Sequence, residues 1–318
     1  MSGQQPRGPQ TQGPLKRQID ASIEALRERL DSAGQMTIES GLFDAGCLRG
    51  SMHTDLGPEQ QDKDMNQDYA LAWSPRDEST PIRFALALAD GLTSSFRAEW
   101  ASALACWTAL ATLMKASCRS TRYTPHQLAQ SAFNAAGEAL RELADQMAND
   151  PEAFRPPDVF ASTWRYILRK RTLLETTLSL AWAQDDLLHI AVLGDGGVLW
   201  RRYAGARRPA ASVQDDLFLG CDPQTDQVRA LGPASPTVDQ FDYWASHDLR
   251  GRFLGALYTD GIGRGIGDKP EVLLTELEEL EALSRGTCNA AREIIERGKQ
   301  RPAAFADNLT LAVLHSNT

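Results

Sequence analysis

The sequence predicts an α+β protein in which antiparallel sheets pack together and pairs of helices lie outside them. The predicted elements come in the order strands, two long helices, strands, two helices and one strand, which is not the strict alternation of a doubly wound parallel sheet. The run at 83–89 is apolar on both faces, as in a strand that is buried between two layers. No repeat of solenoid period occurs in the 318 residues. These observations favour packed antiparallel sheets over a parallel sheet or a solenoid.

A helix is predicted near the N-terminus, ending at Gly34. Its apolar residues Ile19, Ile23, Leu26 and Leu30 recur at steps of four, three and four, which gives one apolar stripe. The stripe has two possible partners, the protein's own body or the helix of a second chain. One short stripe is common in globular chains, and this favours packing on the protein's own body.

Most other elements follow from apolar runs and turn residues. The expected strands are 38–48, 68–74, 82–89, 174–183, 187–193, 197–203, 253–259 and 308–315. The expected later helices are 96–118, 125–149, 270–284 and 287–299. Thr124 and Pro125 are a typical N-cap and first helical position, and tight turns are predicted at 185–186 and 194–197.

Three stretches have weaker patterns. Residues 151–157 are predicted to form a loop, and residues 158–171 a short helix or an irregular insert. Residues 204–250 are polar and rich in Pro and Gly, with ambiguous short strands.

Composition excludes several classes of function. With 33 basic and 42 acidic residues the net charge is −9, and without a basic block the chain is a poor candidate for binding nucleic acid or a membrane surface. No glycine pattern typical of dinucleotide or P-loop sites occurs. The five cysteines are an odd number without a CxxC pair, and residues 1–13 lack the apolar core of a secretory signal. The least polar run, 100–114, is shorter than the roughly 20 residues of a membrane span. We therefore expect a cytoplasmic protein.

Four aspartates lie at the ends of predicted strands. Asp90 and Asp260 each follow an apolar run and precede a glycine, Asp307 precedes the last strand, and Asp68 begins one. Any single Asp-Gly pair is more often a structural turn, so the repetition carries the argument. Carboxylates gathered at one rim repel one another unless a cation neutralises them, and hard oxygen ligands select magnesium or manganese over zinc.

Several short segments resemble, in order, the motifs of the metal-dependent protein phosphatases, the type 2C Ser/Thr phosphatase family. They are Lys63-Asp-Met-Asn66-Gln67-Asp68, Phe84-Ala-Leu-Ala-Leu-Ala-Asp90-Gly91, Glu175-Thr176-Thr177, Val192-Leu193-Gly194-Asp195-Gly196, Tyr258-Thr259-Asp260-Gly261 and Asp307-Asn308-Leu309-Thr310. Gly50-Ser51-Met52-His53 together with Gln67-Asp68 resembles the opening of a bacterial branch. The resemblance spans about residues 40–315.

The resemblance implies a four-layer αββα sandwich of two antiparallel sheets flanked by helices. On this interpretation residues 1–14 are a disordered tail, 15–36 the N-terminal helix and 37–318 the type 2C phosphatase-like domain. The implied function is hydrolysis of phosphoserine and phosphothreonine by direct attack of a metal-bridging hydroxide. The implied cofactors are two Mn or Mg ions, and the implied partners are phosphorylated proteins, namely a Ser/Thr kinase or its targets.

The same resemblance implies a role for each matching residue. Asp90 bridges the two metals and the Gly91 carbonyl ligates one of them, while Asp260 and Asp307 complete the other. Asp68 holds metal-bound waters, and Lys63 replaces the arginine that binds the substrate phosphate. The implied catalytic residues are thus Asp68, Asp90 and Lys63.

The sequence departs from the family pattern at several of these positions. Lys63 is a point charge instead of a bidentate guanidinium, which weakens phosphate binding. Gln67 replaces a Glu, and Leu92 replaces a His proposed as general acid in many members. Asp195 can help to hold a third, weaker metal, but Arg264 stands where many members have an Asp, and this argues against a third site.

Three functions stay open at this point. The first is the protein phosphatase, favoured by the intact acidic set. The second is a catalytically weak or inactive family member that binds phosphoprotein or another partner. The third is a metal-dependent hydrolase of a small phosphorylated metabolite.

Overall fold

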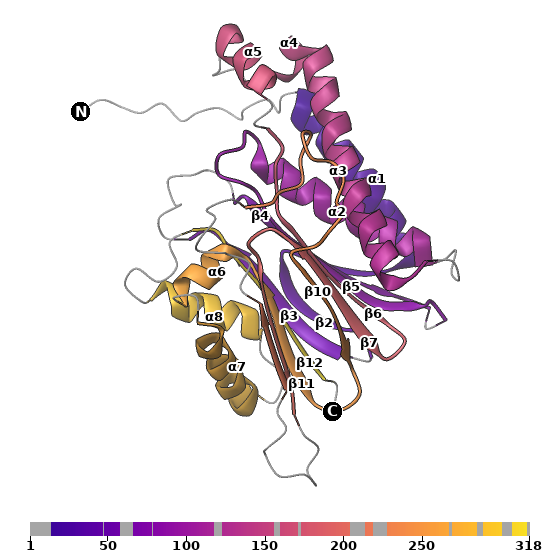
Figure 1. Cartoon of the computed structure of the whole chain (residues 1–318), viewed down its shortest axis with the longest axis vertical. Helices are drawn as coiled ribbons and strands as arrows, with labels where there is room; N and C mark the ends of the chain where they lie inside the picture. The colour runs from indigo at the N-terminus through magenta and orange to yellow at the C-terminus, as the bar shows by residue number, and fades with distance from the viewer. Residues whose placement is uncertain are drawn as a thin grey trace, which may run out of the picture.

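The computed structural model in Figure 1 contains two stacked antiparallel sheets of six strands each. It describes residues 14–46, 48–57, 66–77, 79–117, 123–155, 160–170, 173–203, 214–218, 228–266, 269–284, 289–300 and 307–316. Lys63, and most of the tail predicted at 1–14, lie outside these residues.

The first sheet has the strand order β1-β4-β5-β6-β7-β10. Its strands are β1 (Gly34–Ile38), β4 (Asp68–Pro75), β5 (Ile82–Asp90), β6 (Leu178–Gln184), β7 (Leu187–Leu193) and β10 (Tyr243–Asp248). The second sheet has the order β2-β3-β12-β11-β8-β9. Its strands are β2 (Ser40–Asp44), β3 (Leu48–Asp55), β12 (Leu309–Ser316), β11 (Phe253–Tyr258), β8 (Gly197–Arg202) and β9 (Gln214–Phe218).

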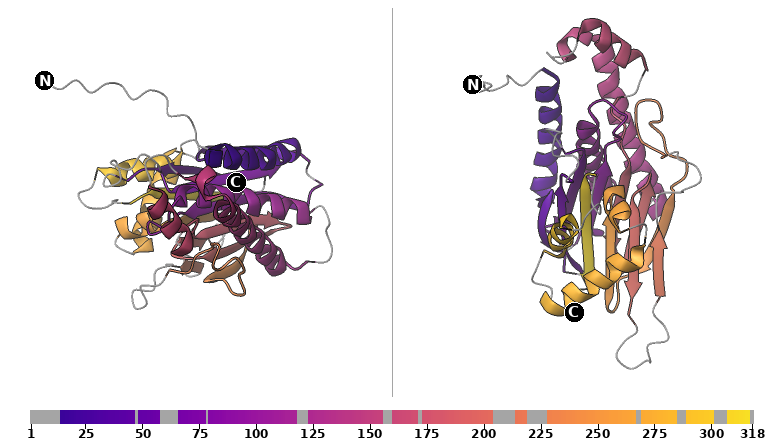
Figure 2. Two further views of the ribbon diagram at one scale, coloured as in Figure 1. Left: turned by 90° about the horizontal axis from the view of Figure 1, so that it is seen from above. Right: turned by 90° about the vertical axis from the view of Figure 1, so that its left-hand side faces the viewer.

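Helices cover the outer face of each sheet and complete four layers (Figures 1 and 2). The first sheet carries α1 (Pro14–Ala33), α2 (Ala98–Ser117) and α3 (Pro125–Asn149), and the short α4 (Pro151–Phe154) and α5 (Ala161–Lys170) follow at the end of α3. The second sheet carries α6 (Asp260–Gly265), α7 (Pro270–Ser284) and α8 (Ala290–Lys299). This is the αββα sandwich that the resemblance implied, so that expectation is confirmed.

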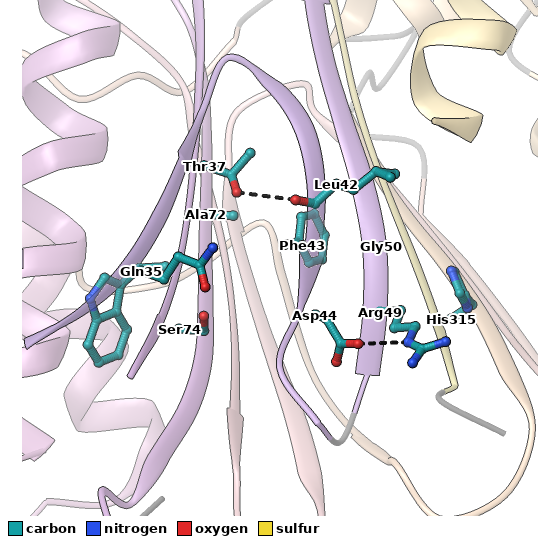
Figure 3. Close-up of a pocket in the computed structure, with 11 residues that line it drawn as sticks. Gln35, Thr37, Leu42, Phe43, Asp44, Arg49, Gly50, Ala72, Ser74 and His315 are labelled. Atoms are coloured by element: carbon teal, nitrogen blue, oxygen red, sulfur yellow. Dashed lines mark hydrogen bonds and ion pairs between the residues drawn. The ribbon is translucent and has the colours of Figure 1, made fainter. Parts of the chain in front are cut away.

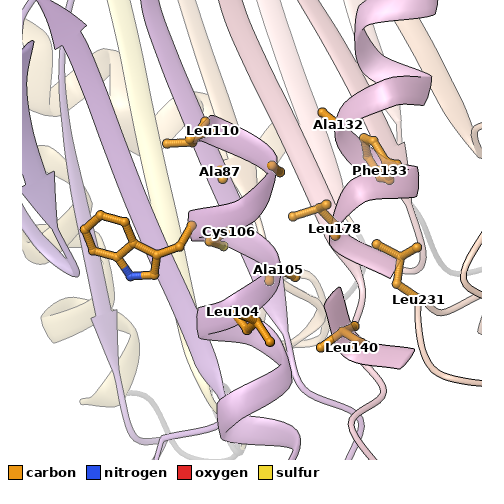
Figure 4. Close-up of a cluster of buried hydrophobic side chains, with 14 of the residues drawn as sticks. Ala87, Leu104, Ala105, Cys106, Leu110, Ala132, Phe133, Leu140, Leu178 and Leu231 are labelled. Atoms are coloured by element: carbon orange, nitrogen blue, oxygen red, sulfur yellow. The ribbon is translucent and has the colours of Figure 1, made fainter. Parts of the chain in front are cut away.

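Strand β5 shows why its sequence is apolar throughout. Phe84, Leu86 and Leu88 point into the core between the two sheets, whereas the intervening residues 85, 87 and 89 are alanines that face the helices. Alternate residues of a strand point to opposite faces, so burial on both faces removes any polar alternation. Figure 4 shows side chains of α2 and α3 meeting those of β5 and β6 on the helix side.

The apolar stripe of α1 packs on the protein's own body, as favoured above. Ile19 and Leu30 are buried in the core beneath the helices, and Ile23 and Leu26 pack against that core. The indole Nε1 of Trp73 on β4 donates a hydrogen bond of 3.1 Å to the carbonyl oxygen of Leu30. This stripe therefore does not need a helix of a second chain to be buried.

Long elements were predicted well, and the irregular stretches less well. The N-cap at Thr124 and the bounds 125–149 of α3 are confirmed, and the N-cap forms a capping box with Gln127. The single strand predicted at 38–48 is wrong, because the chain forms the end of β1, crosses to β2 in the other sheet and turns again into β3. The loop predicted at 151–157 contains the helical turn α4.

The turn at 194–197 has a larger role than a local reversal. It joins β7 of the first sheet to β8 of the second, so the chain changes layers there. Gly194 has φ +110°, a conformation that favours glycine.

Within the described ranges, every helix is too short or too polar to span a lipid bilayer.

Candidate metal centre

Asp68 and Asp90 lie side by side at one end of the first sheet. Asp68 begins β4 and Asp90 ends β5, and the antiparallel register pairs these two residues directly. Asp68 is buried and Asp90 is half-buried. The Asp68 N–H donates to the Asn66 side-chain oxygen at 3.0 Å, which fixes the entry to β4.

Two threonines hold the backbone of Asp90. Thr177 accepts from the Asp90 N–H through Oγ1 at 3.1 Å, and the N–H of Thr177 donates to the Asp90 carbonyl at 2.8 Å. Thr176 Oγ1 donates to the same carbonyl at 2.9 Å. Thr176 and Thr177 therefore fix the backbone from which the Asp90 side chain projects.

Hydroxyl groups connect the two sheets beside Asp68. Thr259 Oγ1 donates to Asp68 Oδ2 at 2.8 Å and accepts from the Thr310 N–H at 3.0 Å. Thr310 Oγ1 in turn contacts Thr54 Oγ1 at 2.8 Å. Because Thr259 follows β11 and Asp68 begins β4, this chain of hydrogen bonds brings the ends of both sheets together.

Asp260 and Asp307 lie together on the side of the second sheet. Asp260 begins α6 directly after β11, and Asp307 precedes β12. The Arg264 guanidinium contacts both, with Nη2 at 2.5 Å from Asp260 Oδ2 and Nη1 at 3.3 Å from Asp307 Oδ2. Gly261 allows the close approach, since a Cβ there would lie 2.0 Å from the Asn308 carbonyl oxygen.

Three carboxylates converge between the sheets. Asp90, Asp195 and Asp260 each offer an oxygen, and these oxygens all lie within 4.8 Å of one another. The Oδ1 atoms of Asp68, Asp195 and Asp260 are buried and have no hydrogen-bond partner among the described residues. Buried acceptors without partners are costly, so these atoms fit a cation as their ligand. An all-oxygen set suits Mg²⁺ or Mn²⁺.

Burial raises the pKa of four carboxyl groups at this end of the sandwich, those of Asp68, Asp90, Asp195 and Asp260. It raises the pKa of Asp68 to about 7 and that of Asp195 to about 6. The pKa of Asp90 lies well above its ordinary value, through burial first and then through the charges of Asp68 and Asp260. Burial also raises the pKa of Asp260, and the charge of Arg264 opposes that rise. Positive charge among these groups is therefore stabilising.

The structure thus brings four predicted aspartates, Asp68, Asp90, Asp260 and Asp307, to one end of the sandwich. Gly91 also lies there, where its N–H donates to the Gln67 carbonyl at 3.1 Å. The remaining site prediction, Lys63, falls outside the described residues.

Asp195 was not among the predicted ligands of the main centre, yet it belongs to the converging set. The sequence signal was an acidic residue in a glycine-rich turn between two buried strands. That turn does not reveal that it joins the two sheets, and the join is what places Asp195 beside Asp90 and Asp260.

A pocket of about 340 Å³ lies elsewhere, between the edge strands of the two sheets (Figure 3). It is lined by Gln35 and Thr37 of β1, by β2 and β3, and by residues 72–74 of β4. Its charged groups Asp44 and Arg49 pair with each other at 2.8 Å. None of the converging carboxylates lines it.

Comparison with known proteins adds a family and a fold. A family model described as Protein phosphatase 2C matches residues 57–220, which is more than half of the chain. No curated protein sequence matches the chain.

Solved structures share the fold at low sequence identity. The catalytic domain of the serine/threonine protein phosphatase PstP, solved with two manganese ions, is 19% identical, with a TM-score of 0.55 over 85% of this chain and 99% of that one. PppA, a regulatory component of T6SS in Pseudomonas aeruginosa, is 15% identical, with a TM-score of 0.54 over 85% and 97%. A serine-threonine phosphatase 2C from Toxoplasma gondii is 11% identical, with a TM-score of 0.60 over 89% and 99%.

Proposed function

Because the chain belongs to the protein phosphatase 2C family, we propose that it is a metal-dependent phosphatase that hydrolyses phosphoserine and phosphothreonine in proteins. The observation that carries the proposal is the convergence of Asp90, Asp195 and Asp260 within 4.8 Å at the end of the sandwich. The buried Oδ1 atoms of Asp195 and Asp260, which have no hydrogen-bond partner in the part of the chain that the structure describes, support a site for divalent cations.

We propose that the cofactors are two Mn or Mg ions. When bound, such ions lower the pKa of water and neutralise the charge of a phosphoryl group. Asp90, Asp260 and Asp307 would hold them together with the Gly91 carbonyl, and Asp195 lies close enough to Asp90 and Asp260 to contribute.

The other residues of the chain orient the reactants. Asp68 Oδ2 is fixed by Thr259, which leaves the buried Oδ1 available to accept a hydrogen bond from the attacking water. The attack is direct, so no phosphorylated side chain is required. Lys63 is proposed from the sequence as the residue that binds the substrate phosphate. Its single ammonium group would bind less tightly than a bidentate guanidinium.

The proposal is tested by hydrolysis of p-nitrophenyl phosphate and of a phosphothreonine peptide in MnCl₂ or EDTA. We expect manganese-dependent turnover that falls by about 10³-fold or more in Asp90→Asn, because that variant lacks the central charged ligand. Asp145→Asn is the matched control, since Asp145 is exposed on α3 and is not one of the converging carboxylates. Turnover that persists in EDTA or in Asp90→Asn would contradict the mechanism.

The second candidate is a weak or inactive member that binds phosphoprotein or a partner. The observation in its favour is that Arg264 already contacts Asp260 and Asp307, two of the proposed ligands. Absence of turnover at every manganese concentration, with phosphopeptide binding retained, would favour it. Faster turnover of sugar phosphates than of the phosphopeptide would instead indicate a metabolite phosphatase.

We also propose a cytoplasmic location, in which the substrates would be a Ser/Thr kinase or its targets. The support is cysteine usage, since the five cysteines are an odd number and lack paired spacing. The described cysteine, Cys106, is a buried free thiol.

A further inference from the structure

The positively charged side chain of Arg264 forms ion pairs with two carboxylates of the candidate metal centre. Arg264 is on α6, one turn after Asp260, and it contacts Asp260 Oδ2 and Asp307 Oδ2 together. Asp260 and Asp307 are 47 residues apart in the sequence. Arg264 forms an ion pair with each of them on the side of the second sheet. The contact thus joins α6 to the start of β12.

The oxygen atoms of Asp260 and Asp307 differ in whether another residue already donates to them. Asp307 receives the Asn308 N–H on Oδ1 at 2.9 Å and Arg264 on Oδ2, so both of its oxygens have protein donors. Asp260 Oδ2 forms an ion pair with Arg264, whereas Asp260 Oδ1 is buried and has no hydrogen-bond partner among the described residues. A cation that binds Asp307 Oδ2 therefore has to share that oxygen with Arg264 or displace the guanidinium.

Arg264 is also the side chain that can leave most easily. Its side chain is 60% exposed, whereas those of Asp260 and Asp307 are 9% and 22% exposed. Because the guanidinium is exposed, water solvates it well once it leaves the two carboxylates. A divalent ion near Asp260 would in addition repel the positive charge of Arg264.

From this geometry we propose that Arg264 is an internal cation that competes with the divalent metal for Asp260 and Asp307. The inference rests on the proposed function, since it assumes that these aspartates bind metal. Its consequence is that Arg264 weakens metal binding and raises the metal concentration at which the site fills. It also holds α6 against residues 307–308 until metal takes over that role.

The test measures Mn²⁺ affinity by isothermal titration calorimetry on the full chain, with wild type, Arg264→Gln and Arg264→Lys. We expect Arg264→Gln to bind Mn²⁺ about three- to tenfold more tightly than wild type, and Arg264→Lys to fall between them. Arg297→Gln is the matched control, because Arg297 makes the same i,i+4 contact with Glu293 on α8. Its affinity should equal that of the wild type.

Thermal unfolding supplies a second measurement that does not depend on activity. In EDTA, Arg264→Gln should melt about 2–4 °C below wild type, and saturating MnCl₂ should remove the difference. Unchanged or weaker Mn²⁺ binding by Arg264→Gln overturns the inference, as does a melting difference that persists in MnCl₂. If neither wild type nor Arg264→Gln binds Mn²⁺, the proposed function fails as well. If wild type binds Mn²⁺ and Asp90→Asn does not, the metal site of the proposed function is supported, and a negative result with Arg264→Gln then counts against the inference about Arg264 alone.

Discussion

At the scale of single residues, the four most buried carboxyl groups of the cluster act against the stability of the fold. Asp68, Asp195 and Asp260 are each less than a tenth exposed, and Asp90 lies among them. Burial raises the pKa of all four, which means that the folded chain disfavours their charged forms. A soluble domain without a ligand to bind would gain stability from neutral side chains here.

We predict that Asp195→Asn stabilises the protein in EDTA at pH 7.5 by about 1–2 kcal/mol. Burial raises the pKa of Asp195 from 3.8 to about 6, so its contribution to stability is fully present below pH 3.8 and is lost as the pH rises through 6. The advantage of the variant should therefore shrink as the pH falls from 7.5 towards 4. Urea unfolding at several pH values in EDTA measures it.

The exposed Asp145→Asn serves as the control for this pH dependence, and it should match wild type throughout. An Asp195→Asn variant that is less stable than wild type at pH 7.5 would show that the carboxylate forms a stabilising contact. In that case the raised pKa would not describe the folded protein.

Sequence reasoning at this scale identified the residue types but not every partner. Asp68, Asp90, Asp260 and Asp307 can be selected as candidate ligands from the sequence because each stands next to one end of a predicted strand. The contact of Arg264 with Asp307 was not, because it depends on how α6 meets the segment before β12. Local sequence carries no information about that meeting.

At the scale of elements, the position of helix α6 determines the distance between the carboxylates of Asp260 and Asp307. It was not predicted, because its six residues, Asp260–Gly265, include three glycines and resemble a loop. The glycine at its second position permits the helix to lie directly on residues 307–308. A Cβ at Gly261 would lie 2.0 Å from a backbone oxygen, and a backbone atom cannot move aside cheaply.

We expect Gly261→Ala to destabilise the protein by about 2–3 kcal/mol and to weaken Mn²⁺ binding, because α6 must move away from Asp307. Urea unfolding and titration calorimetry measure the two effects. Gly196→Ala is the comparison, since its Cβ would meet a rotatable hydroxyl, Ser179 Oγ, at 2.9 Å. Equal losses in both variants would mean that the close approach at Gly261 is not important.

The other elements missed by the sequence share a physical cause. Strands β2 and β3 were merged with β1 because the chain reverses twice within a few residues, and β9 and β10 are edge strands with weak apolar patterns. The layer change at 194–197 looks like any tight turn from the sequence. Which sheet a strand joins is decided by contacts distant in sequence, and these are not encoded in local periodicity.

At the scale of the whole molecule, the candidate metal centre lies where the two sheets meet. Asp68 and Asp90 belong to the first sheet, Asp260 and Asp307 flank strands of the second, and Asp195 is in the connection between them. Ligands from both sheets mean that bound metal would link the two halves of the sandwich.

We predict that MnCl₂ at about a hundredfold excess over its Kd raises the melting temperature by about 4–8 °C relative to EDTA. The reason is that metal binds the folded cluster and not the unfolded chain. The shift should disappear in Asp90→Asn. An equal shift in that variant would place the metal elsewhere, and His53, Asp55 and Glu296 on the outside of β3 and α8 would then be the group to mutate.

The direct pairing of Asp68 with Asp90 has an evolutionary consequence. A slip of one residue between β4 and β5 would turn Asp68 to the opposite face of its strand and separate the two carboxyl groups. Insertions and deletions within these strands should therefore be eliminated by selection for ion binding as well as for stability. Length changes in the connection between β4 and β5 would leave the pairing intact and should be tolerated among related proteins.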